Sequence, residues 1–330
     1  MVPLPITLKQ VAIVMPVYND WAAAQKVLAG IDAALSTIPC RGRVLMVDDA
    51  STEEVDRSWT QLPSVDDAWI LHLRRNLGHQ RAIAMGLVYV YQNWVSQNGR
   101  GVDAIVVMDS DGEDRPQDIP ALLARFVEGG GREVVFAARS KRLESPAFRF
   151  FYQTYRVLHK ALTGISVRVG NFSVLPPVVL GRLMVVSELW NHYAAAVFRA
   201  RIPHTSIPLP RGTRLAGRSK MNFVSLLVHG LSAISVFSDV VGARLLALAA
   251  LAIVLAIVLV AVVAGVRMFT DLAIPGWATY VTGILLIVLA QALIVSLALV
   301  FIIVNGRAMP TFLPIRDAAF FIERVEQVNG

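Results

Sequence analysis

Two aspartates one residue apart, Asp109 and Asp111, are the most chemically informative residues of this sequence. They follow the apolar run AIVVM at residues 104–108, so a buried strand would deliver both carboxylates to one end of a sheet. Carboxylates are the hard oxygen ligands that Mg²⁺ and Mn²⁺ prefer, and these ions in turn bridge phosphate oxygens. A calcium loop is excluded, because it needs Gly at its sixth position and Glu at its twelfth, where this sequence has Gly112 fourth and Pro120 twelfth. The pair therefore indicates a Mg²⁺ or Mn²⁺ site that handles phosphate.

Polar residues also follow two earlier apolar runs. The run VLMV at residues 44–47 leads into Asp48 and Asp49, and the run VAIVM at residues 11–15 leads into PVYND. Aspartate is common in turns after strands, so one such site alone would say little. Parallel strands, however, present their carboxyl ends to a single crevice, where such sheets bind ligands. We therefore expect the three groups to meet there.

The expected elements form an α/β domain. Continuous apolar runs predict strands at residues 11–15, 44–47, 69–73, 104–108 and 133–137, in a parallel sheet covered on both faces. Helical patterns occupy residues 20–35, 78–95 and 116–128.

Two long apolar segments near the C-terminus predict a membrane hairpin. Residues 243–266 carry one charge, Arg244, and residues 277–304 carry none. A bilayer core needs roughly 20 apolar helical residues, so both segments are long enough to cross. Before them, residues 221–241 place apolar side chains at helical spacing after a basic run, which predicts an amphipathic helix in the headgroup layer. An ordinary core-facing helix is the alternative for that segment.

Composition narrows the class of partner and the compartment. The net charge of +7 favours an anionic partner such as lipid headgroups, a phosphorylated substrate or nucleic acid. The single cysteine, Cys40, excludes an intramolecular disulfide and fits a reducing compartment. The first ten residues lack a signal-peptide pattern, and basic residues flank the two apolar segments more than they occupy the connector. Both termini are therefore expected in the cytoplasm.

Six motifs in order along the chain carry a resemblance to a known family. They are VMPVYND (14–20), VDDAS (47–51), RNLGHQRAIAMGL (75–87), MDSDGEDRP (108–116), AARSKR (137–142) and RGTRLAGRSKMNF (211–223). Together they resemble the family 2 glycosyltransferases, and within them the polyprenol-phosphate group that includes dolichol-phosphate mannose synthase. The resemblance implies a GT-A type, Rossmann-like glycosyltransferase domain at residues 1–220. It is followed by the amphipathic helix, two transmembrane helices within residues 242–306 and a cytoplasmic tail at residues 307–330.

The resemblance also assigns roles to individual residues. Catalysis falls to Asp109, Asp111 and Arg139, and the metal to Asp109, Asp111 and Glu113. Nucleotide binding falls to Pro16, Tyr18, Asn19, Asp20, Asp49, Arg75, Asn76 and Asp109. The acceptor phosphate falls to Arg211, Arg214, Arg218 and Lys220, a cluster that attraction to lipid headgroups alone would also explain. His79 reads either as a phosphate contact or as a surface histidine. No contact is assigned to Asn171, because many relatives carry an arginine in that segment.

The implied activity is transfer of one sugar, with inversion, from a UDP- or GDP-sugar to polyprenyl (undecaprenyl or dolichyl) phosphate. Such an enzyme would serve cell envelope glycosylation at the bacterial inner membrane, with no nucleic-acid partner and with a homo-oligomer left open. One alternative is a processive polysaccharide synthase, which carries a Gln-x-x-Arg-Trp motif. The nearest string here, QTYRV at residues 153–157, lacks the Trp. The other alternative, a non-catalytic membrane scaffold, would have no need of paired carboxylates.

Overall fold

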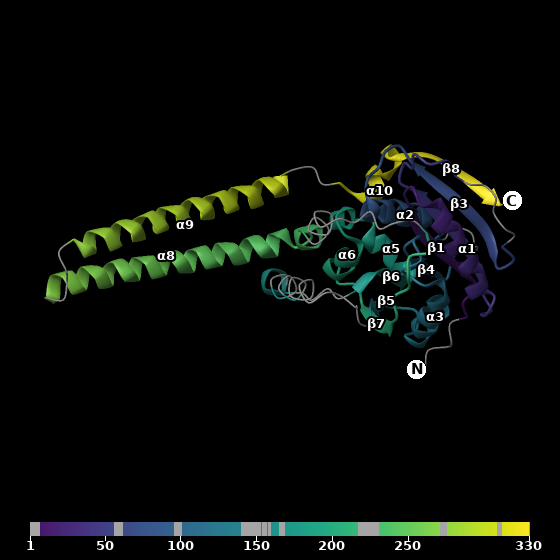
Figure 1. The fold of residues 1–330 in the computed structure, drawn as a ribbon, viewed down its shortest axis with the longest axis horizontal. Coiled ribbons are helices and arrows are strands. Elements are labelled where there is room, and N and C mark those ends of the chain that lie inside the picture. Colours follow the sequence, from purple (N-terminus) through teal and green to yellow (C-terminus); the bar gives the residue numbers. More distant parts are fainter. Residues whose placement is uncertain are drawn as a thin grey trace. The chain divides into compact units, whose positions relative to one another are not determined.

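A computed structural model describes residues 7–55, 62–95, 101–139, 153, 157, 160–164, 169–216, 231–270, 276–308 and 312–329 of the chain. The chain divides into two compact units. The first comprises residues 1–151, 166–236 and 311–330, and the second comprises residues 152–165 and 237–310. The first unit holds a sheet covered by helices, and the second holds two long helices (Figure 1).

The strands of the first unit form one eight-stranded sheet in the order β7-β5-β6-β4-β1-β2-β3-β8. Their bounds are β1 Gln10–Val17, β2 Arg41–Asp48, β3 Val65–Leu73, β4 Ala104–Val107, β5 Val134–Arg139, β6 Val169–Leu175, β7 His204–Leu209 and β8 Ile322–Asn329. All five strands predicted from apolar runs are confirmed. The prediction of a parallel sheet holds for β4-β1-β2-β3 and for β5 with β7. It is wrong for β6 and β8, which pair antiparallel with their neighbours.

The helices of the first unit cover both faces of the sheet. They are α1 Trp21–Leu35, α2 His79–Asn93, α3 Ile119–Glu128, α5 Pro177–Leu183, α6 Tyr193–Arg199 and α10 Pro314–Asp317, with short 3₁₀ turns at Pro116–Asp118 (η1), Ser187–Trp190 (η2) and Ala318–Phe320 (η3). Successive strand residues point to opposite faces. In β1, Ile13 and Met15 therefore pack with α1 and α3, while Ala12 and Val14 pack with α2, α5 and α6. Because both faces are buried, the strands read as continuous apolar runs.

The second unit contains α8 Ser238–Phe269 and α9 Trp277–Ala308. Both are long and apolar enough to cross a membrane, with mean hydropathies of 3.3 for α8 and 2.9 for Trp277–Ile302 over their most apolar windows. Only 11% and 0% of these windows are buried, so neither helix is the core helix of a soluble domain. The two apolar segments that the sequence predicts to be helical are thus long, exposed helices in the structure. Most of the predicted amphipathic helix lies outside the described residues, since the described part resumes at residue 231 and α8 begins at Ser238.

The C-terminal segment returns to the sheet. The sequence predicted a cytoplasmic tail at residues 307–330, with no strand assigned to it. In the structure this segment contains β8, which pairs antiparallel with β3 at the sheet edge. The Trp190 ring lies 3.9 Å from that of Phe312 and 5.1 Å from that of Phe321, measured between centroids. The Arg74 backbone N–H donates to the Phe321 carbonyl over 2.9 Å. This return places the tail against the loop between β3 and α2.

Candidate functional site

The carboxyl ends of β1, β2 and β4 meet at one edge of the sheet, as the sequence predicted. The Asp49 N–H donates to the Val17 carbonyl over 2.9 Å, which joins the end of β2 to that of β1. The buried Ser110 hydroxyl donates to the Pro16 carbonyl over 2.7 Å, which joins the loop after β4 to β1. Three groups that are distant in sequence thus lie side by side at this edge of the sheet.

Asn19 holds the loop that follows β2. Its φ is +48°, a left-handed conformation that Asn tolerates better than most residues. Its side-chain oxygen accepts from the backbone N–H groups of Thr52 at 2.7 Å and Glu53 at 3.1 Å, and its own N–H donates to the Ser51 hydroxyl at 3.0 Å. Tyr18 beside it is 41% exposed, so its ring is accessible to a ligand.

Asp49 holds a second loop. Its carboxylate accepts from the backbone N–H groups of Leu77 at 2.6 Å and Gly78 at 2.8 Å. Burial raises the pKa of Asp49, although these two hydrogen bonds act in the opposite direction. The same loop exposes Arg75 and Asn76, and the Arg75 guanidinium lies 6.0 Å from the centroid of the Phe321 ring.

The loop after β4 is curled by its own acidic residues. The Asp109 N–H donates to Asp114 over 2.9 Å, and the Glu113 N–H donates to Asp111 over 2.9 Å. Gly112 between them has a φ of +87°. Burial and the neighbouring Asp109 raise the pKa of Asp111, while nearby arginines oppose that shift. We did not single out Asp114 or Ser110 from the sequence, although both lie within the motif that drew attention to the loop.

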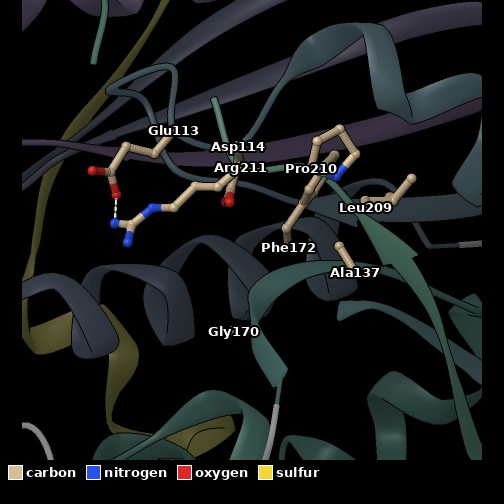
Figure 2. Close-up of a pocket in the computed structure, with 8 residues that line it drawn as sticks. All are labelled: Glu113, Asp114, Ala137, Gly170, Phe172, Leu209, Pro210 and Arg211. Carbon is tan, nitrogen blue, oxygen red and sulfur yellow. Dashed lines mark hydrogen bonds and ion pairs between the residues drawn. The ribbon is translucent and has the colours of Figure 1, made fainter. Parts of the chain in front are cut away.

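Two of the arginines predicted to bind the acceptor phosphate contact this acidic loop. Arg214 is paired with Asp111 at 3.1 Å and with Asp20, and Arg211 is paired with Glu113. Figure 2 shows the Arg211 guanidinium reaching the Glu113 carboxylate. The two segments are also joined through their backbones. The Gly212 N–H donates to the Glu113 carbonyl over 2.8 Å, and the Leu215 N–H donates to the Asp111 carbonyl over 2.9 Å.

A small pocket lies beside this junction (Figure 2). Polar groups of the acidic loop and of Arg211 line one part of it, and apolar residues of the neighbouring strands line the rest. The lining residues are Glu113, Asp114, Ala137, Gly170, Phe172, Leu209, Pro210 and Arg211. Charged and apolar walls therefore meet directly at the acidic loop.

His79, the first residue of α2, faces the same loop. Its Nε2 lies 3.0 Å from Asp109 Oδ1 and 3.0 Å from the side-chain nitrogen of Asn171. Desolvation lowers the pKa of His79, but the nearby carboxylates, Asp109 foremost, outweigh it and raise the pKa. Asn171 comes from β6, a strand that apolar patterning did not reveal, and the sequence gave no sign of its position beside Asp109.

The donor set fits a divalent ion that also binds substrate phosphate. Within the described part of the chain, no group of three or more His, Cys, Asp or Glu residues is arranged to hold a metal ion alone. Mg²⁺ in phosphate-handling sites is typically held by one or two carboxylates plus the substrate phosphates. Asp109 and Asp111 offer hard oxygens of this kind. Burial and the negative charge of Asp109 raise the pKa of Asp111, and a cation would relieve the repulsion between the two carboxylates.

Three predicted residues fall at or beyond the limits of the described side chains. Arg139 ends β5, in register with Leu209 of β7, and its side chain lies outside the described set. Arg218 and Lys220 lie in the segment 217–230, which is also outside it.

Comparison with known proteins places this site in a family. The sequence model of the family "Glycosyl transferase family 2" matches residues 12–176, half of the chain. This range contains the ends of β1, β2 and β4 and the acidic loop.

Two curated relatives are similar over much of their length. An uncharacterized glycosyltransferase, YkcC of Bacillus subtilis, is 27% identical over 85% of this chain and 86% of its own length. An undecaprenyl-phosphate 4-deoxy-4-formamido-L-arabinose transferase of Klebsiella pneumoniae is 26% identical over 66% of this chain. The match spans 64% of that relative's length. Among solved structures, glucosyl-3-phosphoglycerate synthase of Mycobacterium tuberculosis matches with a TM-score of 0.49 at 13% identity, covering 71% of this chain and 80% of its own.

Proposed function

Because this chain belongs to glycosyl transferase family 2, we propose that it moves one sugar from a UDP- or GDP-sugar to polyprenyl phosphate, with inversion at the anomeric carbon. The observation that carries the proposal is the acidic loop after β4, where Asp109 and Asp111 stand beside the loops that follow β1 and β2. The named function of the undecaprenyl-phosphate transferase relative supports the class of acceptor.

The donor half of the reaction uses the crevice. Tyr18, Asn19 and the loop held by Asp49 surround the nucleoside, with Pro16, Asp20, Arg75 and Asn76 beside it. Asp109, Asp111 and Glu113 would hold Mg²⁺ or Mn²⁺, which when bound offsets the charge that develops on the leaving diphosphate. Arg139 adds positive charge from the end of β5. Inversion requires only one displacement, in which an acceptor oxygen bonds to the anomeric carbon as the bond to the diphosphate oxygen breaks.

The acceptor half uses the basic segment that starts at Arg211. A lipid phosphate is largely ionised near neutral pH, because its second pKa is about 6, so it needs little help from a general base. Arg211 and Arg214 would exchange their carboxylate partners for phosphate oxygens, and Arg218 and Lys220 would complete the cluster. A guanidinium binds phosphate through two parallel donors, which suits this exchange.

The two apolar helices would keep the enzyme where its acceptor is. In this proposal α8 and α9 cross the bacterial inner membrane, and the catalytic unit and both termini lie in the cytoplasm. The lipid phosphate then arrives at the membrane surface while its tail stays in the bilayer.

The test is a donor screen with the full chain in lipid nanodiscs. UDP- and GDP-sugars, radiolabelled in the sugar, are incubated with undecaprenyl phosphate and Mg²⁺ or Mn²⁺, and the label is counted in the lipid phase. One donor is expected to label the lipid with a single sugar, and Asp111→Asn should serve as the inactive control. Label in a long water-soluble polymer would instead indicate the processive synthase. Absence of transfer from every donor would refute the proposal.

A further inference from the structure

A series of hydrogen-bonded side chains leads from the core of the first unit, called the catalytic unit below, to the acidic loop after β4. It begins at the Tyr193 backbone N–H, which donates to Gln80 Oε1 over 2.8 Å. Gln80 Nε2 donates to Asn171 Oδ1 over 3.1 Å. Asn171 Nδ2 donates to Asp109 Oδ1 over 3.5 Å and lies 3.0 Å from His79 Nε2, and His79 Nε2 lies 3.0 Å from the same Asp109 oxygen. The function proposed above uses only the last member of this path, Asp109.

The direction of the chain is fixed by its first link. A backbone N–H can only donate, so Gln80 must turn its oxygen toward Tyr193 and its amide nitrogen toward Asn171. Asn171 must then accept with its oxygen, and its NH₂ group faces His79 and Asp109. The Tyr193 backbone N–H in the core thus sets the orientation of both side-chain amides.

Burial differs between the two ends of the same path. Gln80 is 8% exposed and Asn171 is 9% exposed, so both amides are held within the unit. The His79 side chain is 42% exposed and that of Asp109 is 19% exposed. The buried end of this path therefore lies in the core, and its more exposed end lies where the donor would bind.

From this geometry we infer that Gln80, Asn171 and His79 are positioning residues, which hold the Asp109 carboxylate in the orientation needed to bind the metal-nucleotide donor. The inference rests on the proposed function. Hydrogen bonds from outer groups orient ligating carboxylates, and removing such a partner costs about 10- to 100-fold in metal affinity or activity. Nε2 of His79 cannot both accept from the Asn171 NH₂ group and donate to the Asp109 carboxylate. His79 and Asn171 therefore each donate to Asp109 directly, and Gln80 acts through Asn171.

A matched pair of variants at His79 tests this role. In His79→Gln the amide nitrogen reaches about as far as the imidazole Nε2, so a donor to Asp109 is retained. In His79→Asn the shorter side chain brings its amide only as far as the ring Nδ1, so that donor is lost. His79 is partly exposed, and both variants should fold with the thermal unfolding temperature of the wild type. Gln80→Glu keeps the oxygen that faces the Tyr193 N–H but removes the donor to Asn171.

Binding is measured without turnover on the full chain in nanodiscs. Mn²⁺ binding is followed by electron paramagnetic resonance with saturating UDP or GDP, and nucleotide binding is followed by calorimetry with Mn²⁺ present. We expect His79→Asn to weaken Mn²⁺ binding about tenfold or more, His79→Gln to stay within about threefold of the wild type, and Gln80→Glu to fall between them. In transfer assays the His79→Asn change should raise the KM for the donor more than the KM for polyprenyl phosphate.

The outcomes separate this inference from the proposed function. If the wild type binds Mn²⁺ and nucleotide but the two His79 variants bind equally well, the positioning role is wrong and the proposed function stands. If the expected series is seen in binding while the wild type transfers no sugar to polyprenyl phosphate, the role stands and the acceptor assignment fails. A wild type that binds neither Mn²⁺ nor nucleotide would overturn both.

Discussion

Asp111 shows how a single residue can cost stability while serving function. Its pKa is raised by burial and by Asp109, so its charge is unfavourable where it stands, although Arg214 relieves part of that cost. Asp111→Asn keeps the shape of the side chain and removes the charge. We expect transfer to fall about 100-fold or more, as when a preorganised electrostatic partner of the transition state is lost. The unfolding temperature should stay equal or rise slightly. Turnover close to that of the wild type in saturating Mn²⁺ would show that this carboxylate does not serve the metal.

Cys40 provides a residue-scale probe of folding. It is buried, and burial raises the pKa of its thiol to about 11. Because the thiolate is the reactive form, the folded chain at pH 8 should react with iodoacetamide far more slowly than the chain unfolded in denaturant, whose thiol has a pKa of about 8.5. Mass spectrometry of the labelled Cys40 peptide measures this directly. Rapid labelling under native conditions would mean that the segment around residue 40 opens readily.

The backbone of the basic segment approaches that of the acidic loop closely at Gly212. A Cβ at Gly212 would lie 2.3 Å from the Gly112 carbonyl oxygen, and backbone cannot yield as a flexible side chain can. Gly212→Ala should therefore push the basic segment off the acidic loop and break the hydrogen bond to the Glu113 carbonyl. We expect both transfer activity and the unfolding temperature to fall. Gly283→Ala in α9 is the matched control, since nothing lies within 4 Å of its added methyl, and it should leave both unchanged. Equal behaviour of the two variants would show that the junction is not tightly packed.

The strands differ in how well the sequence predicts them. The central strands were predictable because burial on both faces makes them continuous apolar runs. In β8, by contrast, the apolar residues Ile322, Val325 and Val328 recur every three positions, a spacing closer to a helix than to a strand. Its pairing with β3 contains register shifts, which break the alternation expected of a regular strand. Strand pairing across the long hairpin is a tertiary property that local patterning does not contain.

The same limit applies to the site. The spacing of Asp109 and Asp111 was informative because adjacent motif residues must act together. The partners of these carboxylates come from α2, β6 and the segment after β7, which only the folded sheet brings to one place. Arg211 and Arg214 were recognised as basic, but their pairing with the acidic loop depends on the backbone hydrogen bonds that join the two segments.

At the scale of the whole molecule, the chain leaves the catalytic unit for the two apolar helices and then returns to it. The returning segment supplies β8, and its Phe321 packs against Trp190 and lies under Arg75. Removing everything after residue 237 would therefore expose the edge of β3 as well as remove the helices. Replacing only residues 238–310 by a flexible linker of about 20 residues would keep the strand.

These two shortened versions should differ, although both lack α8 and α9. We expect the linked version to unfold near the temperature of the catalytic unit in the full chain and to bind UDP or GDP with similar affinity. The version ending at residue 237 should unfold at a lower temperature, aggregate more readily and bind nucleotide more weakly, because Arg75 loses the ring beneath it. Differential scanning fluorimetry and calorimetry compare the two, with the full chain as reference. Equal unfolding temperatures and equal affinities would mean that the returning segment is an appendage. The expected difference would mean that β8 is an integral part of the catalytic unit, whose sequence the two apolar helices interrupt.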